Sequence, residues 1–428
     1  MNEKHPLLQS FIDKVKAQIK SKEAQDLVEY EIINHIESRS QSYQRDGLTK
    51  EEADKKTINQ MGNPITFGKE MNQLHRPRID WALIFLVTTI IGISLVPMYT
   101  LSFIFEGLFM KKVIFSLIAM IIIISLMFYD YRKLEKLGFF LYISSVVMML
   151  WIGMIGLDFQ GKKMWHIGYI KIDYMFSLLL FYISWSSILQ HRNKYHIIIL
   201  HLLFWLPMLL YLWNGYYLYS IIYFITILVL INIEKINSGQ RRQFTWSTSA
   251  FGLILSTVLF FLSSPYQQER LLAFLHPEQY KNTFAYHSSI SREMIAKAGW
   301  LGQGNIHEQV RLPEAHTDLI LPYITYFFGW GGGLLLTGIL LFFTVRMVQV
   351  AIKTRHHYGK FIVIGGFTIF LISLLINMLM SIGLLPYVGI PLPFISYGGV
   401  QLIFYSTIVG LILSVYRREK IHSLTSIE

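Results

Sequence analysis

The chain contains no cysteine among its 428 residues, and charged residues are scarce at 15%. The missing cysteines exclude disulfide bonds, thiol nucleophiles and metal sites built on thiolates. A typical soluble protein carries about 25% charged residues. The P-loop, the GxGxxG fingerprint, the GxSxG elbow and the HExxH zinc motif are also missing. ATP-driven transport and the familiar hydrolase classes therefore lack their usual marks.

Acidic residues are outnumbered, with 27 Asp and Glu against 38 Lys and Arg, which gives a formal net charge of +11. What the chain has in abundance is apolar residues, at 53%, with a mean hydropathy of +0.43. Polar residues concentrate in 1–78, and long apolar runs follow Trp81. The basic residues fall in the breaks between these runs, so they indicate membrane topology and lipid-phosphate contacts. We expect no nucleic-acid partner.

Ten apolar runs are long enough to span a bilayer, which needs about 20 residues each. They lie near residues 81–100, 112–129, 137–157, 173–190, 196–213, 217–234, 246–264, 320–345, 361–384 and 396–416. The predicted fold class is all-α: a polytopic membrane protein with about ten transmembrane helices, preceded by a small soluble helical domain. We place the domains at 1–78 and 79–428. Because alternate breaks carry the basic residues, both termini are predicted to be cytoplasmic and the long loop 265–319 to face outward.

The segment 1–78 repeats apolar residues at helical spacing, which predicts three or four short helices in a cytoplasmic bundle. Thr49 with Glu52 predicts a capping box, and Gly62 with Asn63-Pro64 predicts the end of that helix. No signal-peptide core is present, so we expect the segment to remain attached. The stretch "HIESRSQSYQRDGLTKEEADKKTINQMGNP" resembles the small helical prefix domain of some bacterial permease-like proteins. That resemblance names no chemistry, and a solvated helical appendage for docking or stability is favoured over a catalytic role.

The outward break "FQGKKMWHIGYIK" (159–171) runs against the charge bias, because it carries Lys162, Lys163 and Lys171. Basic residues on the outer side are explained by an anionic ligand such as a lipid pyrophosphate. Charges tolerated in a short loop explain them equally well. Both readings stay open from the residues alone.

Titratable residues also crowd the end of the long outer loop, in "RLPEAHTDLI" (311–320). A loop of this length is uncommon without a function, and "LLAF" and "SREMIAKAGW" within it are candidate amphipathic pieces at the membrane surface. Asp318 stands where the next helix is expected to begin. It either caps that helix, a contribution of about 1 kcal/mol, or acts as a general base or a ligand of a divalent cation.

The stretch "INMLMSIGLLPYVGIPLPFISYGG" (376–399) cannot form one unbroken helix, because prolines and glycines interrupt it throughout. Broken backbone at membrane depth survives only where protein or a cavity satisfies its polar groups. The segment is therefore predicted to be re-entrant or kinked and to line a site. Asn377, inside the preceding span, is predicted to face the interior.

Three stretches together resemble the SEDS family, the shape, elongation, division and sporulation proteins of the RodA, FtsW and SpoVE group. They are "GLLPYVGIPLPFISYGG", "YQQERLLAFLHPE" and "GQGNIHEQVRLPEAHTDLIL". Their order, the ten spans and the loop between the seventh and eighth spans also match, so the resemblance covers about 80–418. It implies a peptidoglycan glycosyltransferase of the bacterial cytoplasmic membrane that polymerises lipid II, the undecaprenyl-pyrophosphate-linked glycan. It also implies a class B penicillin-binding protein as partner.

Asp318 matches the catalytic aspartate of this family. The resemblance implies that it is the general base for the attacking sugar hydroxyl or the carboxylate that positions a divalent cation, magnesium or manganese. The residues expected to bind substrate are Lys162, Lys163, Trp165, Arg270, Arg311, Glu314, His316, Ser396 and Tyr397. The residues expected to have structural roles are Pro391, Pro393, Gly398 and Gly399.

The sequence departs from the family pattern at three places near the implied lipid site. Met164 in "GKKMW" stands where an arginine is expected, "DYMF" (173–176) replaces "QPSE", and Val400-Gln401 replaces two small hydroxyl residues. These changes favour a divergent member with an accessory or sporulation-related role. Two alternatives stay open: a flippase or transporter of lipid-linked precursor, which would need charged residues mid-span, and a non-catalytic scaffold for a transpeptidase.

Overall fold

The computed structural model describes residues 6–159, 162–167, 170–191, 196–234, 238–262, 265–304 and 314–419. The chain divides into two compact units, one of Met1–Asp80 with Tyr416–Glu428 and one of Trp81–Val415.

The first unit is a bundle of four helices, α1 (Pro6–Lys16), α2 (Lys22–Arg45), α3 (Lys50–Gln60) and α4 (Pro64–Leu74). Apolar side chains of α1 and α2, among them Ile12, Val15 and Ile32, form its core. The predicted capping box is confirmed, because the Thr49 hydroxyl accepts from the Glu52 amide and the Glu52 carboxylate accepts from the Thr49 amide. The four-helix bundle therefore follows from the helical spacing of the apolar residues and from the capping box at Thr49.

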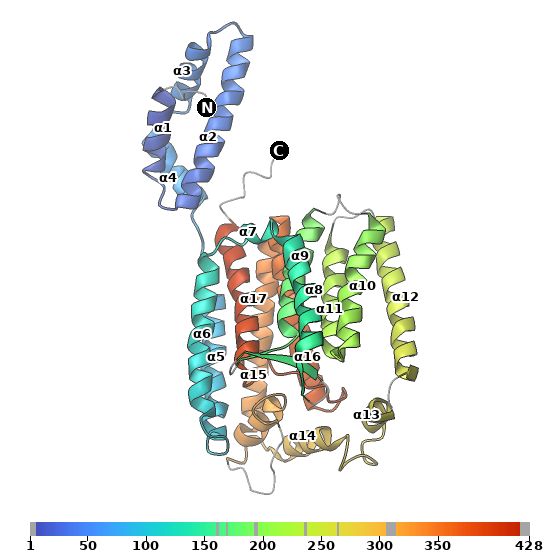
Figure 1. The fold of residues 1–428 in the computed structure, drawn as a ribbon. Helices are drawn as coiled ribbons and strands as arrows, with labels where there is room; N and C mark the ends of the chain where they lie inside the picture. The colour runs from blue at the N-terminus through green and yellow to red at the C-terminus, as the bar shows by residue number, and fades with distance from the viewer. Residues whose placement is uncertain are drawn as a thin grey trace. The chain divides into compact units, whose positions relative to one another are not determined.

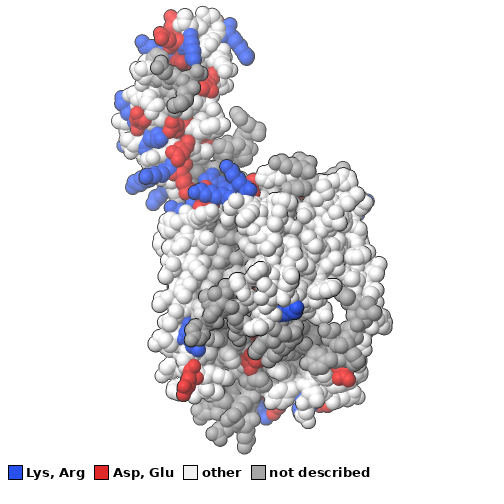
Figure 2. Space-filling view, viewed as in Figure 1, with Lys and Arg blue, Asp and Glu red and all other residues white. Residues whose placement is uncertain are grey.

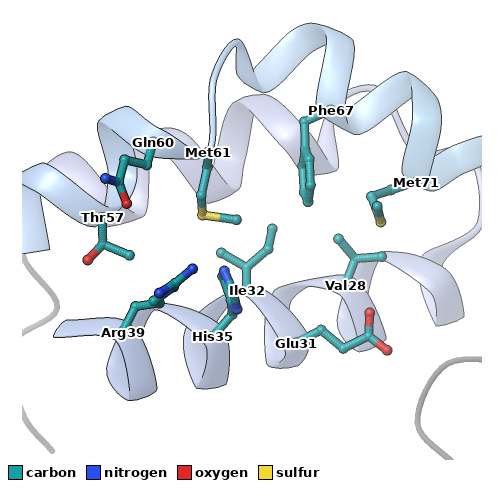
Figure 3. A pocket seen from close by; sticks show the side chains of 10 residues that line it. All are labelled: Val28, Glu31, Ile32, His35, Arg39, Thr57, Gln60, Met61, Phe67 and Met71. Carbon is teal, nitrogen blue, oxygen red and sulfur yellow. The ribbon is translucent and has the colours of Figure 1, made fainter. Parts of the chain in front are cut away.

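A cavity of about 600 Å³ opens on this bundle between α2 and the α3–α4 pair (Figure 3). Val28, Ile32 and Phe67 give it apolar walls, while Glu31 lines it from α2. Burial raises the pKa of the Glu31 carboxyl, and the nearby His75 ring opposes that shift.

The second unit is a helical bundle in which each of the ten predicted runs is a helix. Its helices are α5 (Trp81–Leu101), α6 (Leu108–Phe128), α7 (Arg132–Glu135), α8 (Gly138–Ile155), α9 (Met175–Gln190), α10 (Ile197–Trp213), α11 (Tyr217–Ile233), α12 (Ser238–Leu262), α15 (Ile320–Lys353), α16 (His357–Ser381) and α17 (Gly399–Arg418). Within the residues that the structure describes, six of them are long and apolar enough to cross a membrane, and α9, α10 and α11 are shorter apolar helices. Along the helices facing the viewer, the described atoms are mostly uncharged (Figure 2). The predicted fold class is confirmed.

A small sheet interrupts the helices in the break that was expected to be a loop. Its strands are β1 (Leu157–Phe159), β2 (Lys162–Ile167) and β3 (Ile170–Ile172), antiparallel in the order β1-β2-β3. Leu157 pairs with Met164 and Trp165 with Ile172. This sheet was not predicted from the sequence, and it fixes Lys163, Met164 and Trp165 on one strand.

The long loop contains two helices, α13 (Pro265–Leu275) and α14 (Tyr286–Lys297), where the amphipathic pieces were predicted. They lie at the end of the bundle opposite α7 (Figure 1). The glycine-rich turn after α14 pairs with a break in α15: the Gln303 and Gly304 amides donate to the carbonyls of Tyr326 and Phe327. The break is at Gly329, whose φ of 80° lies in the left-handed region. The first part of α15 is therefore a separate short helix held by the outer loop.

The predicted broken segment is confirmed between α16 and α17. Residues 382–398 contain no helix, and the backbone reverses at Gly383, Gly389 and Phe394, which have φ values of 79°, 66° and 64°. We call residues 382–398 the hairpin. Its second half, residues 390–396 with Pro391 and Pro393, is buried, so the backbone there lies inside the protein, as the energetics of a membrane interior require.

Candidate functional site

Asp318 lies in a tight turn directly before α15. The amides of Thr317 and Leu319 both donate to the Glu314 carbonyl at 3.1 Å, and Glu314 has a φ of 54°. The helix begins at Ile320, and Leu319 occupies the N-cap position without a side-chain capping bond. Asp318 therefore precedes the N-cap residue, and its side chain does not occupy the capping position of α15.

The carboxylate of Asp318 meets the hairpin. The Tyr387 hydroxyl donates to Asp318 Oδ2 at 3.0 Å. A Cβ added at Gly389 would lie 3.1 Å from the same oxygen, and the φ of +66° at Gly389 already favours glycine. Glycine at this position thus gives the carboxylate room beside the hairpin backbone.

The backbone of Asp318 is fixed from the membrane side by Asn377. This asparagine is completely buried, and its amide nitrogen donates to the Asp318 carbonyl at 2.8 Å and to the Ile390 carbonyl at 2.6 Å. The prediction that Asn377 faces the interior is confirmed. One side chain of α16 therefore ties the Asp318 turn to the hairpin.

Ser396 and Tyr397 attach the far end of the hairpin to the same turn. The Ser396 hydroxyl donates to the Thr317 carbonyl at 2.6 Å and accepts from the Leu392 amide at 2.7 Å. The Tyr397 amide donates to the His316 carbonyl at 2.7 Å. Both residues were predicted to bind substrate, which stays a prediction; their contacts in the structure are to backbone next to Asp318.

His316 and Glu314 lie in the turn with Asp318. The His316 ring packs against Phe105 at 4.7 Å and Tyr397 at 5.8 Å between ring centres. Burial lowers the pKa of His316, although Glu314 opposes the shift, so burial favours the neutral ring. Glu314 is exposed, and its carboxylate accepts from the Thr317 hydroxyl at 2.6 Å.

The outer-loop helix α14 supports the tyrosine that binds Asp318. His287 stacks on Tyr387 with ring centres 4.5 Å apart and planes at 10°. One turn further along α14, the Ser291 hydroxyl donates to the Ser381 carbonyl at 2.5 Å. Sequence analysis missed His287, Tyr387 and Gly389 as site residues. The only signal was that the last two fall inside the proline-glycine stretch.

The described part of the basic outer break is held by α8 and by the start of α11. The Lys163 ammonium donates to the Gly153 carbonyl at 2.5 Å, and the Tyr216 hydroxyl donates to the Lys163 carbonyl at 2.6 Å. Trp165 packs edge-on against Trp151 of α8. The described contacts of these residues are thus to α8 and its neighbours. The side chains of Lys162 on β2 and Arg270 on α13, and all of Arg311, lie outside the described residues.

Gly398 and Gly399 make close approaches at the start of α17. A Cβ added at Gly399 would lie 2.3 Å from Cε1 of Phe115 on α6, and one at Gly398 would lie 2.6 Å from Oε1 of Gln401. Their predicted structural roles, like those of Pro391 and Pro393, stay predictions that this packing supports.

A divalent cation finds no ready-made cage in the described part of the chain. No group of three or more His, Cys, Asp or Glu lies together there. Ca²⁺ takes about six to eight oxygen ligands, and even Mg²⁺ needs one or two carboxylates together with substrate phosphates. Asp318 alone is not a cage for a resident metal, but one carboxylate is enough where substrate phosphates supply the other ligands, so a magnesium or manganese ion held with the substrate stays a prediction.

The arrangement is a single carboxylate on a rigid turn, at the end of an apolar helical bundle, with a tyrosine hydroxyl and a histidine nearby. Such a group can accept a proton from a hydroxyl placed against it. These features define a polytopic membrane protein with a carboxylate-centred site at one end of its bundle.

The chain belongs to the family of cell cycle proteins that comprises FtsW, RodA and SpoVE, whose sequence profile matches residues 78–421. It is 34% identical over 176 residues to "Probable peptidoglycan glycosyltransferase FtsW" of Geobacter sulfurreducens, over 40% of this chain and 47% of that protein. It is 32% identical over 168 residues to "Peptidoglycan glycosyltransferase MrdB" of Escherichia coli K12, over 38% of this chain and 45% of that protein. The matched region thus spans less than half of these curated relatives.

Two solved structures share the fold. The first, reported as "Structural coordination of polymerization and crosslinking by a peptidoglycan synthase complex", matches with a TM-score of 0.67 and 21% identity, over 79% of this chain and 98% of that one. The rod shape determining protein RodA of Thermus thermophilus matches with a TM-score of 0.58 and 18% identity, over 80% and 97%. At these identities the likeness establishes the architecture of the helical bundle.

Proposed function

We propose that this chain is a membrane glycosyltransferase that polymerises lipid II into peptidoglycan glycan strands. The observation that carries the proposal is the Asp318 carboxylate, held against the hairpin by Tyr387 while Asn377 fixes its backbone. Family membership supports the proposal, because relatives of the chain are named peptidoglycan glycosyltransferases.

In the proposed reaction, Asp318 accepts the proton of the acceptor sugar's 4-hydroxyl as that oxygen attacks the anomeric carbon of the donor. The bond from the anomeric carbon to pyrophosphate breaks, and undecaprenyl pyrophosphate leaves with the electron pair. The rigid turn contributes by positioning the base, since a fixed geometry converts an encounter into an effectively unimolecular step. The pyrophosphate charge needs basic groups, for which Lys162, Lys163 and Arg270 stay the candidates.

The chain is an integral membrane protein, and we place it in the bacterial cytoplasmic membrane with both termini cytoplasmic. This orientation rests on the basic residues in alternate breaks and puts α13, α14 and Asp318 at the outer face. We also propose a class B penicillin-binding protein as partner, which is supported by the structural neighbour reported as a peptidoglycan synthase complex.

A non-catalytic scaffold is the second candidate, and one observation favours it. The Lys163 ammonium is hydrogen-bonded to the Gly153 carbonyl, and Asp173 in the altered "DYMF" stretch accepts from the Tyr219 hydroxyl and the Met175 amide. Groups beside the implied lipid site are therefore engaged within the protein. A scaffold would keep the fold and partner while losing the reaction.

Polymerisation of purified lipid II tests the proposal, with and without a co-purified class B penicillin-binding protein. Wild type is expected to form glycan strands, and Asp318→Ala to form none while melting at the same temperature. Strand formation by neither protein, with the partner bound, would favour the scaffold. Transport of labelled lipid II across vesicles by both proteins would favour the flippase.

A further inference from the structure

Lys112 is a lysine buried in the membrane helix α6. Its exposed fraction is 1%, and among the described residues no ion pair involves it. A fully buried lysine in a membrane helix usually has a functional reason, because burying its charge is costly. The sequence analysis gave Lys112 no role.

The ammonium of Lys112 binds one turn of the hairpin. Nζ donates to the carbonyls of Phe394 at 2.8 Å, Ile395 at 3.3 Å and Ser396 at 2.8 Å. These three carbonyls converge because the backbone reverses at Phe394, whose φ is 64°. A lysine ammonium has three donor hydrogens, so all of them are used on successive carbonyls.

The turn that Lys112 binds is the one that holds the Asp318 loop. Ser396 gives its carbonyl to Lys112 and its hydroxyl hydrogen to the Thr317 carbonyl. Its neighbour Tyr397 donates its amide to the His316 carbonyl. Two backbone anchors immediately before Asp318 therefore depend on the turn that Lys112 closes.

From these contacts we infer that Lys112 is a positioning residue for Asp318, acting through the 394–396 turn and Ser396. The expected effect of Lys112 on activity rests on the proposed glycosyl transfer. The expected effect of Lys112 on the structure of the turn is independent of that proposal. Removing the ammonium leaves three buried carbonyls without their donor, so the turn rearranges and the Asp318 loop loses its two anchors.

The test compares Lys112→Met, Lys112→Arg and Lys111→Met in the full-length protein with its partner. Lys111→Met is the matched control, because Lys111 is the adjacent lysine and is exposed. Lys112→Met is expected to lower kcat for lipid II by about tenfold or more, with KM changed by less than about twofold, as for a group that positions the reacting carboxylate. Lys112→Arg should recover part of the loss, and Lys111→Met should match wild type.

Hydrogen exchange supplies a readout that needs no activity. Lys112→Met should raise exchange in 314–319 and 392–398 while leaving the N-terminal bundle and the second part of α15 unchanged. If Lys112→Met exchanges like wild type in those two segments, or keeps full activity, the inference is overturned. If Lys112→Met shows the predicted exchange pattern but wild type makes no glycan strands, the proposed function fails and the positioning role is upheld.

Should Lys112→Met fail to fold, Lys112→Arg and Ser396→Ala decide the matter as a double-mutant cycle. Both act through the same anchor, so the double mutant is expected to lose little more activity than the worse single mutant. Losses that multiply would show independent action and would contradict the inference.

Discussion

The Tyr387 hydroxyl donates to Oδ2 of Asp318 at 3.0 Å, which links the hairpin to the carboxylate by a side chain. His287 of α14 stacks on the same tyrosine. The outer loop therefore reaches the carboxylate through one aromatic ring.

Tyr387→Phe is predicted to lower strand formation by about ten- to 150-fold, because the hydrogen bond that fixes the orientation of the Asp318 carboxylate is worth about 1.5–3 kcal/mol. The rate of lipid II polymerisation measures this. Tyr30→Phe is the control, since Tyr30 is 63% exposed on the N-terminal bundle. Equal rates for Tyr387→Phe and wild type would remove Tyr387 from the site.

Gly389→Ala is predicted to abolish most activity in a folded protein. The added Cβ would lie 3.1 Å from Asp318 Oδ2 at a φ of +66°. Gly299→Ala is the matched control, because Gly299 has the same φ of +66° and nothing within 4 Å of an added Cβ. Both variants bear the left-handed strain, which is about 1–2 kcal/mol, but only Gly389→Ala crowds the carboxylate. Equal activities would show that backbone strain alone matters.

Gly399→Ala is predicted to destabilise the helical unit by about 1–3 kcal/mol through overpacking. The added Cβ would lie 2.3 Å from the Phe115 ring. Thermal unfolding in detergent measures the loss. The double variant Gly399→Ala with Phe115→Ala should recover part of it, whereas simple addition of the two losses would contradict the assigned contact.

The start of α3 is predicted to lose protection as pH falls. The bonds from Thr49 lower the pKa of Glu52 below its ordinary value of 4.5. A carboxyl whose pKa is lower in the folded state stabilises the fold at pH values above its pKa in the unfolded state. This stability is lost as the pH falls through the pKa of the folded state. Amide exchange at Glu52, corrected for its intrinsic pH dependence, measures it. The pH dependence should weaken in Thr49→Ala, which loses the hydroxyl bond and keeps the backbone one, and an unchanged pH dependence there would exclude the capping box as the cause.

The helices of the membrane unit could be predicted because each apolar run is continuous and bounded by polar breaks. The capping box at Thr49 and the buried Asn377 could also be predicted, because each depends only on neighbouring residues: the spacing of Thr49 and Glu52, and an asparagine inside an apolar run. The roles of Lys112 and His287 could not, because their partners are 282 and 100 residues away in sequence, at Phe394 and Tyr387. The small sheet was missed because its three strands are only three to six residues long.

The sharpest test of the account is the rate of glycan-strand formation by Asp318→Asn beside wild type, with purified lipid II and the penicillin-binding partner. Asparagine keeps the size of the side chain and an oxygen that accepts from Tyr387, but it is not a base. We predict a folded protein whose rate falls by at least about a hundredfold, the lower end of what a general base contributes. An Asp318→Asn protein that forms strands at the wild-type rate would contradict the central claim that this carboxylate performs the transfer.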